Sequence, residues 1–89
     1  MSFSRTSRTL APQSDGMTAA GVQSTQWHEW INEGLMVKPV AIGKRGRRVV
    51  LEEVQAVVDA RIAGATDDQI RALVGRLHAE RPRLIDLGL

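Results

Sequence analysis

The clearest pattern of apolar and polar positions along the chain lies between residues 24 and 34. Trp27, Trp30, Ile31 and Gly34 recur at helical spacing and therefore share one face, while the other positions are polar. Gly34 suits the left-handed residue that commonly ends a helix. The sequence predicts an amphipathic helix here, with one face toward the core and a polar face toward solvent.

The residues before this helix carry a weaker pattern. Residues 1–13 are rich in Ser, Thr and Arg and show no periodicity, so we interpret them as a flexible N-terminal arm whose ordered part, if any, lies near Leu10. A short helix is expected from Ser14, although Gly16 weakens it. Ser24 is expected to be the N-cap of the helix that follows.

Two short β-prone runs come next. Pro39 ends any helical continuation, and the apolar runs 40–42 and 49–51 are separated by a polar loop that contains two glycines. Such a loop between two β-prone runs is typical of a β-hairpin. We therefore expect a hairpin at about residues 40–51.

The helical period returns in the last part of the chain. One helix is expected at about residues 52–62, with an inward stripe of Leu51, Val54, Val57, Val58 and Ile62. Thr66 and Gln69 have the spacing of a capping box, which predicts that a second helix begins there and continues to about Glu80. The apolar face of this second helix consists of Ile70, Leu73, Val74 and Leu77.

The predicted order is therefore helix, turn, helix, hairpin, helix, helix. A helix–turn–helix followed by a two-stranded wing defines the expected class, which is mainly α with a small β-hairpin: a winged helix-turn-helix DNA-binding domain. We place this domain at residues 14–81, between the arm at 1–13 and a C-terminal tail at 82–89. The tail has four apolar residues, which either pack back on the domain or meet a partner.

Composition limits the classes of protein that fit this pattern. A chain of 89 residues allows one compact domain, and the absence of cysteine excludes disulfides and thiolate zinc sites. No apolar run is long enough to span a bilayer, and the N-terminus lacks the apolar core of a signal peptide. We therefore expect a cytoplasmic protein with no membrane partner.

Charge is unevenly distributed, although the net charge is only +2. Residues 35–51 contain five Lys or Arg residues and no acid, whereas residues 24–34 contain two glutamates and no Lys or Arg. A concentrated positive segment suits a polyanionic partner, because it raises the local concentration of that partner. The candidate DNA-binding residues of the hairpin are Lys44, Arg45, Arg47 and Arg48, whose long side chains can reach phosphates or a minor groove. The alternative is a solvated basic turn.

The polar face of the predicted helix at residues 24–34 offers candidate base contacts. Hydrogen-bonding side chains in the N-terminal half of a recognition helix reach base edges in the major groove. The candidates are Ser24, Thr25, Gln26, His28, Glu29 and Asn32. The alternative is an ordinary solvated face. Trp27 and Trp30 are interpreted as core residues rather than as a base-stacking platform, because the chain has only two Trp, one Phe and no Tyr.

Two segments resemble parts of the MerR-type regulators. The first is residues 21–39, GVQSTQWHEWINEGLMVKP, which is similar to their helix–turn–helix. The second is residues 46–74, GRRVVLEEVQAVVDARIAGATDDQIRALV, which is similar to the wing and the helices that follow it. The small prophage regulators called AlpA, and excisionase or Cox-type proteins, share the first two-thirds of this layout. The resemblance implies a DNA-binding domain that needs no cofactor.

The sequence departs from the MerR pattern in two respects. His28, Glu29 and Trp30 stand where that pattern usually has Arg-Tyr-Tyr, so the family's phosphate contacts from this helix are not carried over. The residues after the last predicted helix are too few for the long dimerisation helix and effector domain of a full regulator. We therefore expect no small-molecule effector domain.

No group of residues in the sequence supports catalysis or metal binding. Asp67 and Asp68 lie in the first turn of a predicted helix, where the helix dipole favours negative charge. His28 and His78 are expected to lie far apart, and the chain has no nucleophile or metal motif at a recognised spacing. We therefore expect no catalytic residues, no metal site and no enzyme.

The sequence thus favours a sequence-specific double-stranded DNA-binding protein of phage or prophage type, either a transcriptional regulator or an excisionase-like recombination directionality factor. One small domain has a small footprint, so a homodimer or cooperative oligomer on DNA is expected. Two alternatives stay open. One is the DNA-recognition subunit of a phage packaging enzyme, similar to a small terminase. The other is a protein-interaction module that uses the apolar tail.

Overall fold

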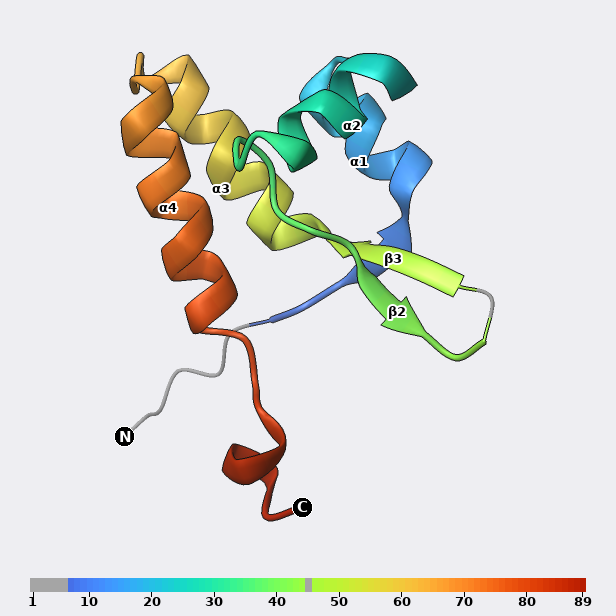
Figure 1. Ribbon diagram of the computed structural model, residues 1–89. Coiled ribbons are helices and arrows are strands. Elements are labelled where there is room, and N and C mark those ends of the chain that lie inside the picture. The colour runs from blue at the N-terminus through green and yellow to red at the C-terminus, as the bar shows by residue number, and fades with distance from the viewer. Residues whose placement is uncertain (1–6, 45) are drawn as a thin grey trace.

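The computed structural model describes residues 7–44 and 46–89, and these residues form a mainly helical chain with a small antiparallel sheet (Figure 1). In chain order the elements are β1 (Leu10–Pro12), α1 (Gln13–Ala20), α2 (Ser24–Asn32), β2 (Val40–Ile42), β3 (Gly46–Val50), α3 (Leu51–Ile62), α4 (Asp67–Ala79) and the 3-10 helix η1 (Leu84–Leu87). The expected mainly α class with a small hairpin is confirmed. No helix of the described residues is long and apolar enough to cross a membrane.

The sheet has three strands in the order β1–β3–β2, so the predicted hairpin is present and its second strand is the central one. Ile42 pairs with Gly46 next to the turn, and the hairpin projects away from the helices (Figure 1). Leu51 belongs to α3 and not to the strand, so the chain passes from β3 into α3 without a loop. The hairpin is therefore attached directly to the helical body.

Strand β1 was not predicted, and it corrects the extent of the expected N-terminal arm. Ala11 is buried within the sheet, and the backbone N–H of Thr9 donates to Glu52 Oε1 at 2.7 Å at the start of α3. Residues 7–13 therefore belong to the folded domain. The rest of the expected arm, residues 1–6, lies outside the described part of the chain.

Trp27 of α2 is at the centre of the core. Its side chain is fully buried, and its indole N–H donates to Gln13 Oε1 at 3.1 Å. Gly16 of α1 lies against the ring: a Cβ at this position would be 2.8 Å from Cη2 of Trp27, so even a methyl group would overlap. The other large, fully buried side chains are Met36, Val37, Val49, Val54, Val57 and Ile70. Gly16, which weakens α1 as a helix, thus allows α1 to pack closely on α2.

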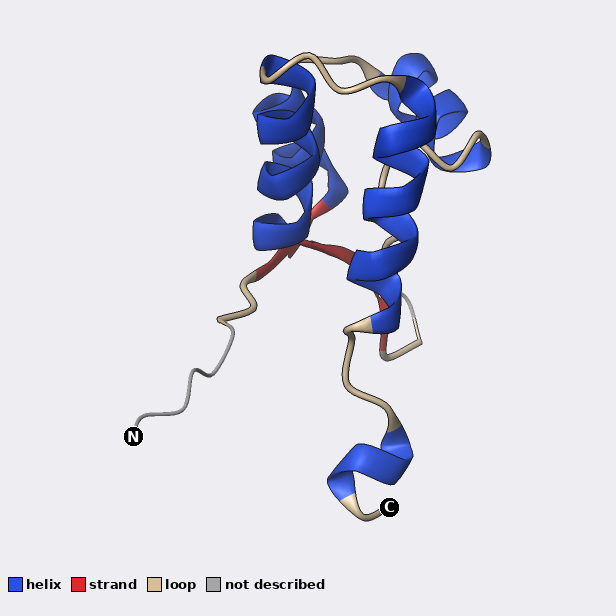
Figure 2. Cartoon of the chain, turned by 90° about the vertical axis from the view of Figure 1, so that its left-hand side faces the viewer, coloured by secondary structure: helices blue, strands red, loops and turns tan. Residues whose placement is uncertain are grey.

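Helices α3 and α4 lie side by side (Figures 1 and 2), and the capping box predicted at Thr66 and Gln69 is confirmed. The inward position predicted for Ile62 is wrong, because this side chain is 79% exposed. The stripe of Val54 and Val57 continues at helical spacing to Arg61 instead. The Arg61 guanidinium stacks over the ring of Trp30, with its central carbon 4.1 Å from the ring centroid.

One further expectation about local structure is wrong, and one of the alternatives left open for the tail is excluded. Ser24 is the first residue of α2 and not its N-cap; Gln23 holds that position, without a side-chain hydrogen bond to the helix. The tail at 82–89 does not pack back on the domain: η1 lies beyond the end of α4 (Figure 2). Its apolar residues Leu84, Ile85, Leu87 and Leu89 are all exposed.

Candidate nucleic-acid interface

The outward face of α2 carries all six side chains predicted for base contact. Ser24, Thr25, Gln26, His28, Glu29 and Asn32 are exposed. They are open to solvent because Trp27, on the opposite side of the helix, is buried, and because Trp30 and Ile31 are partly buried against the core. The helical period of the sequence therefore predicted the exposed face of α2 correctly.

The His28 ring has a defined hydrogen-bonding state. Its Nδ1 lies 2.8 Å from the backbone carbonyl oxygen of Ser24, and a carbonyl oxygen can only accept, so Nδ1 carries the proton. This leaves Nε2 as an acceptor in the neutral ring, able to bind an amino group on an external ligand. His28 is held within its own helix and presents its other nitrogen outward from that bond.

The hairpin carries the predicted basic side chains on different faces. Lys44, Arg47 and Arg48 are exposed, while Arg45 lies outside the described residues. Side chains alternate along a strand, so Arg47 shares a face of β3 with Val49, and Arg48 takes the opposite face. Val49 packs toward α1, since its Cγ2 lies 3.2 Å from the Cβ position of Gly16. Arg47 therefore points to the side of the sheet that α1 and α2 cover.

A pocket of about 360 Å³ lies between α2 and the hairpin, and we call it the α2–hairpin pocket. Its lining residues are Gln13, His28, Ile31, Lys38, Pro39 and Arg47. It brings together one predicted residue of α2, His28, and one predicted residue of the hairpin, Arg47. Lys38 was counted in the basic segment but was not predicted as a site residue. Its position directly before Pro39, at the entrance to the hairpin, was the available signal.

The backbone of Lys38 is fixed by His78 of α4 and by Arg81, which lies just beyond the end of that helix. Its N–H donates to His78 Nε2 at 3.0 Å, and its carbonyl accepts from Arg81 Nη2 at 2.7 Å. Arg81 also pairs with the buried carboxylate of Glu53 at 2.6 Å. Burial lowers the pKa of His78, and Arg81 lowers it further, while Glu53 acts in the opposite direction. A neutral His78 is the form that accepts the Lys38 hydrogen bond.

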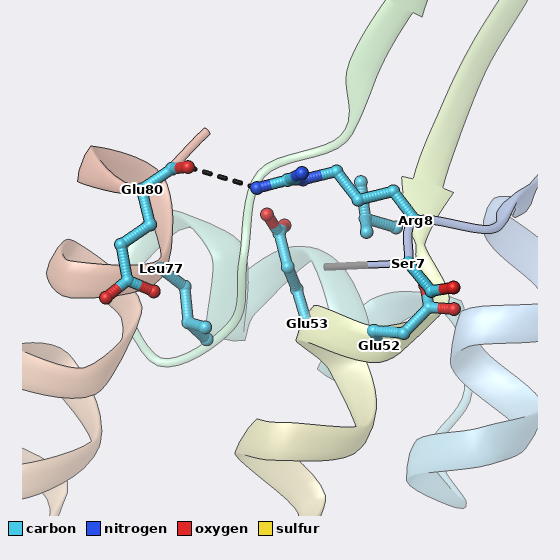
Figure 3. Close-up of a pocket in the computed structure, with 7 residues that line it drawn as sticks. Ser7, Arg8, Glu52, Glu53, Leu77 and Glu80 are labelled. Atoms are coloured by element: carbon cyan, nitrogen blue, oxygen red, sulfur yellow. Dashed lines mark hydrogen bonds between the residues drawn. The ribbon is translucent and has the colours of Figure 1, made fainter. Parts of the chain in front are cut away.

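A second pocket, also of about 360 Å³, lies where β1, α3 and α4 meet (Figure 3), and we call it the acidic pocket. Glu52, Glu53 and Glu80 line it together with Ser7, Arg8, Val50 and Leu77. The Arg8 guanidinium donates to the backbone carbonyl of Glu80 at 3.0 Å (Figure 3). Hydrogen bonds from Thr9 lower the pKa of Glu52 and so favour its charged form. Three carboxylates make this pocket unsuitable for a polyanion.

The remaining candidates from the sequence have structural explanations. Asp67 and Asp68 lie in the first turn of α4, and Asp68 pairs with Arg71 at 3.2 Å. Trp27 is a core residue, as predicted. Within residues 7–44 and 46–89, no three His, Asp or Glu side chains gather in a way that could hold a metal ion.

Comparisons of the chain with protein-family models, with curated proteins and with solved structures found no match in any of the three. The resemblance to MerR-type regulators therefore remains a hypothesis that rests on the two segments quoted above.

Proposed function

We propose that this chain is a sequence-specific double-stranded DNA-binding protein of the winged helix-turn-helix type. In this proposal α2 is the recognition helix, α1 is the helix that precedes it, and the β2–β3 hairpin is the wing. The observation that carries the proposal is the α2–hairpin pocket, in which His28 from the exposed polar face of α2 adjoins Lys38 and Arg47 from the basic segment. DNA recognition needs this combination, because phosphate contacts position the protein and base contacts give specificity.

The exposed face of α2 enters the major groove in this mechanism. Thr25 is near the N-terminal end of the helix, which usually penetrates deepest, and His28 is at its middle. In the neutral His28 ring, Nε2 accepts a hydrogen bond, which suits the amino group of adenine or cytosine. The hairpin lies on the flanking backbone, where its cations neutralise phosphates. A phage or prophage regulator, or an excisionase-like directionality factor, is the role that this arrangement and the MerR-like segments suit best.

One observation favours a second function, a protein-interaction module. The four apolar side chains of the tail are between 61% and 83% exposed; they are Leu84, Ile85, Leu87 and Leu89. Such a cluster suits an apolar docking surface on another protein. This function does not need the basic hairpin, so its partner would bind with little dependence on salt.

Selection from a pool of random duplexes, followed by fluorescence anisotropy on the enriched sequence, tests the proposal. We expect enrichment of a short motif, and an affinity that falls linearly with salt on logarithmic axes. Binding to the enriched duplex should exceed binding to a shuffled duplex by at least about 10³-fold. If no duplex is bound at low salt, the DNA-binding proposal is wrong and the interaction module is favoured.

A further inference from the structure

We infer that the α2–hairpin pocket holds a single backbone phosphate of the DNA, with Lys38 and Arg47 as its two cationic ligands. This inference rests on the proposed function and deepens it, because it assigns a ligand to one pocket and a role to Lys38. The two residues reach the pocket from different segments, Lys38 from the link that follows α2 and Arg47 from β3. A phosphate there would therefore be bound at once by the link that follows the recognition helix and by the hairpin.

The charge of the pocket lining selects an anion. The six lining residues include two cations and no carboxylate. The acidic pocket has the same volume but is lined by three glutamates and one arginine, which makes it a natural comparison within the same molecule. Pocket size alone thus does not single out a phosphate site, whereas charge does.

Gln13 supplies a third donor to the α2–hairpin pocket. Its Oε1 accepts from the buried indole of Trp27 at 3.1 Å, so the orientation of the amide is fixed by the core. The NH₂ end of the amide is then the end available to the pocket, and it can only donate. A phosphate oxygen accepts from such a group. In the neutral His28 ring, Nε2 is an acceptor, which does not suit a phosphate and is left for a base.

Lys38 is well placed for this role because its backbone does not need to be ordered on binding. His78 and Arg81 already hold its N–H and its carbonyl group. Its side chain is exposed and makes no hydrogen bond or ion pair to the described residues. Only the side chain would then lose freedom when the phosphate binds, which lowers the entropic cost of the contact.

The test compares Lys38→Gln and Arg47→Gln with two matched controls, Lys44→Gln and Arg48→Gln. The controls remove the same charges from the hairpin turn and from the opposite face of β3. All four side chains are exposed, so thermal melts should be unchanged. We expect Lys38→Gln and Arg47→Gln each to weaken binding to the selected duplex on the order of tenfold, since hydrogen bonds between charged groups are lost.

A methylphosphonate scan of the same duplex identifies the phosphate itself. Replacing one charged phosphate by the neutral analogue should weaken binding of the wild-type protein at a single position of the duplex. The same replacement should not weaken binding of the Lys38→Gln/Arg47→Gln double variant further. Because both residues hold one phosphate, the double variant should flatten the salt dependence by about 0.9 and not by about 1.8. The Lys44→Gln and Arg48→Gln variants should keep their sensitivity at that position.

The outcomes separate this inference from the proposed function. If the wild-type protein binds no duplex, both are wrong. If it binds a selected duplex but the double variant keeps the wild-type response at every methylphosphonate, DNA binding stands and the phosphate site is wrong. A slope change of about 1.8 in the double variant would also refute the single shared phosphate, because two phosphates would then have been lost.

Discussion

Replacing Arg81 by Met should destabilise the domain strongly, because it removes the partner of a buried carboxylate. Glu53 is 6% exposed, and Arg81 contacts it at 2.6 Å and 2.9 Å through two different nitrogens. The same guanidinium donates to the carbonyl of Lys38. Breaking such a pair from one side leaves a buried charge without compensation, which costs about 3–5 kcal/mol.

The size of this cost can be set against the stability of the whole domain. Domains of this kind are stable by about 5–15 kcal/mol, so the loss is a large fraction of the total. For a domain of this size it corresponds to a fall in Tm of about 12 °C or more. We expect Arg81→Met to melt far below the wild type in circular dichroism, and urea titration to show the same loss of free energy of unfolding.

Two further variants show whether the pair is the cause. Arg83→Met removes an arginine whose side chain is 73% exposed and lies 3.6 Å from Asp86, so it should change stability by about 1 kcal/mol or less. The double variant Glu53→Gln/Arg81→Met removes the buried charge and should recover part of the loss. If Arg81→Met melts as close to the wild type as Arg83→Met does, the buried Glu53–Arg81 pair does not stabilise the domain.

Three other predictions concern the packing of Gly16 in the core, the hydrogen bond between Lys38 and His78, and base contact by α2. Gly16→Ala should lower the free energy of unfolding by about 1–3 kcal/mol, because the added methyl group overlaps Trp27. Gly75→Ala, with no atom within 4 Å of its Cβ position, should instead stabilise α4 by about 0.5–1 kcal/mol. Urea titration measures both changes. The pKa of His78 is lowered in the folded state from its ordinary value of 6.5, so its contribution to stability is complete above that pH and is lost as the pH falls. His78→Gln should therefore reduce this part of the acid dependence of Tm. An unchanged acid dependence of Tm would contradict the assignment. His28→Ala should reduce discrimination between the selected and a shuffled duplex by about 1–3 kcal/mol at fixed salt; an equal loss on both duplexes would make α2 a contact to the backbone only.

The elements that the sequence predicted well are those with a local cause. The capping box needs only Thr66 and Gln69, and the end of α2 needs only a glycine, since Gly34 has a φ of 77°. The hairpin likewise follows from two short β-prone runs and the loop between them. In each case the interacting residues are close in the chain, so the pattern is visible without a fold.

The features that the sequence missed depend on residues far apart in the chain. Strand β1 has three residues, too few to show an alternating pattern, and its order comes from pairing with β3. Glu53 and Arg81 are 28 positions apart, so neither is marked as buried by its neighbours. Ile62 was assigned to the core by extending an apolar stripe, but this side chain is exposed, and the neighbouring Arg61 stacks on Trp30 instead.

The candidate site also combines features with a local cause and features that depend on residues far apart in the chain. Periodicity predicted which side chains of α2 are exposed, because only the helix itself is needed for that inference. Alternation along β3 implies that Arg47 and Arg48 point to opposite faces, but the face that α2 covers depends on the packing of Val49. The backbone of Lys38 is held at the pocket by His78 of α4 and by Arg81 beyond it, about 40 positions away, which no local pattern contains.

Under the proposed function, the link between α2 and β2 limits how binding specificity changes over evolution. Leu35, Met36 and Val37 are buried in sequence, and the link is held at its ends by Arg71 on the carbonyl of Glu33 and by the contacts to Lys38. Inserting or deleting one residue there would move three core side chains out of register. The distance between helix and hairpin is thus inherited as a fixed unit, and new targets should be reached by exchanging surface side chains. Gly43 and Lys44, at the hairpin turn, are exposed, so natural variation in length should accumulate there.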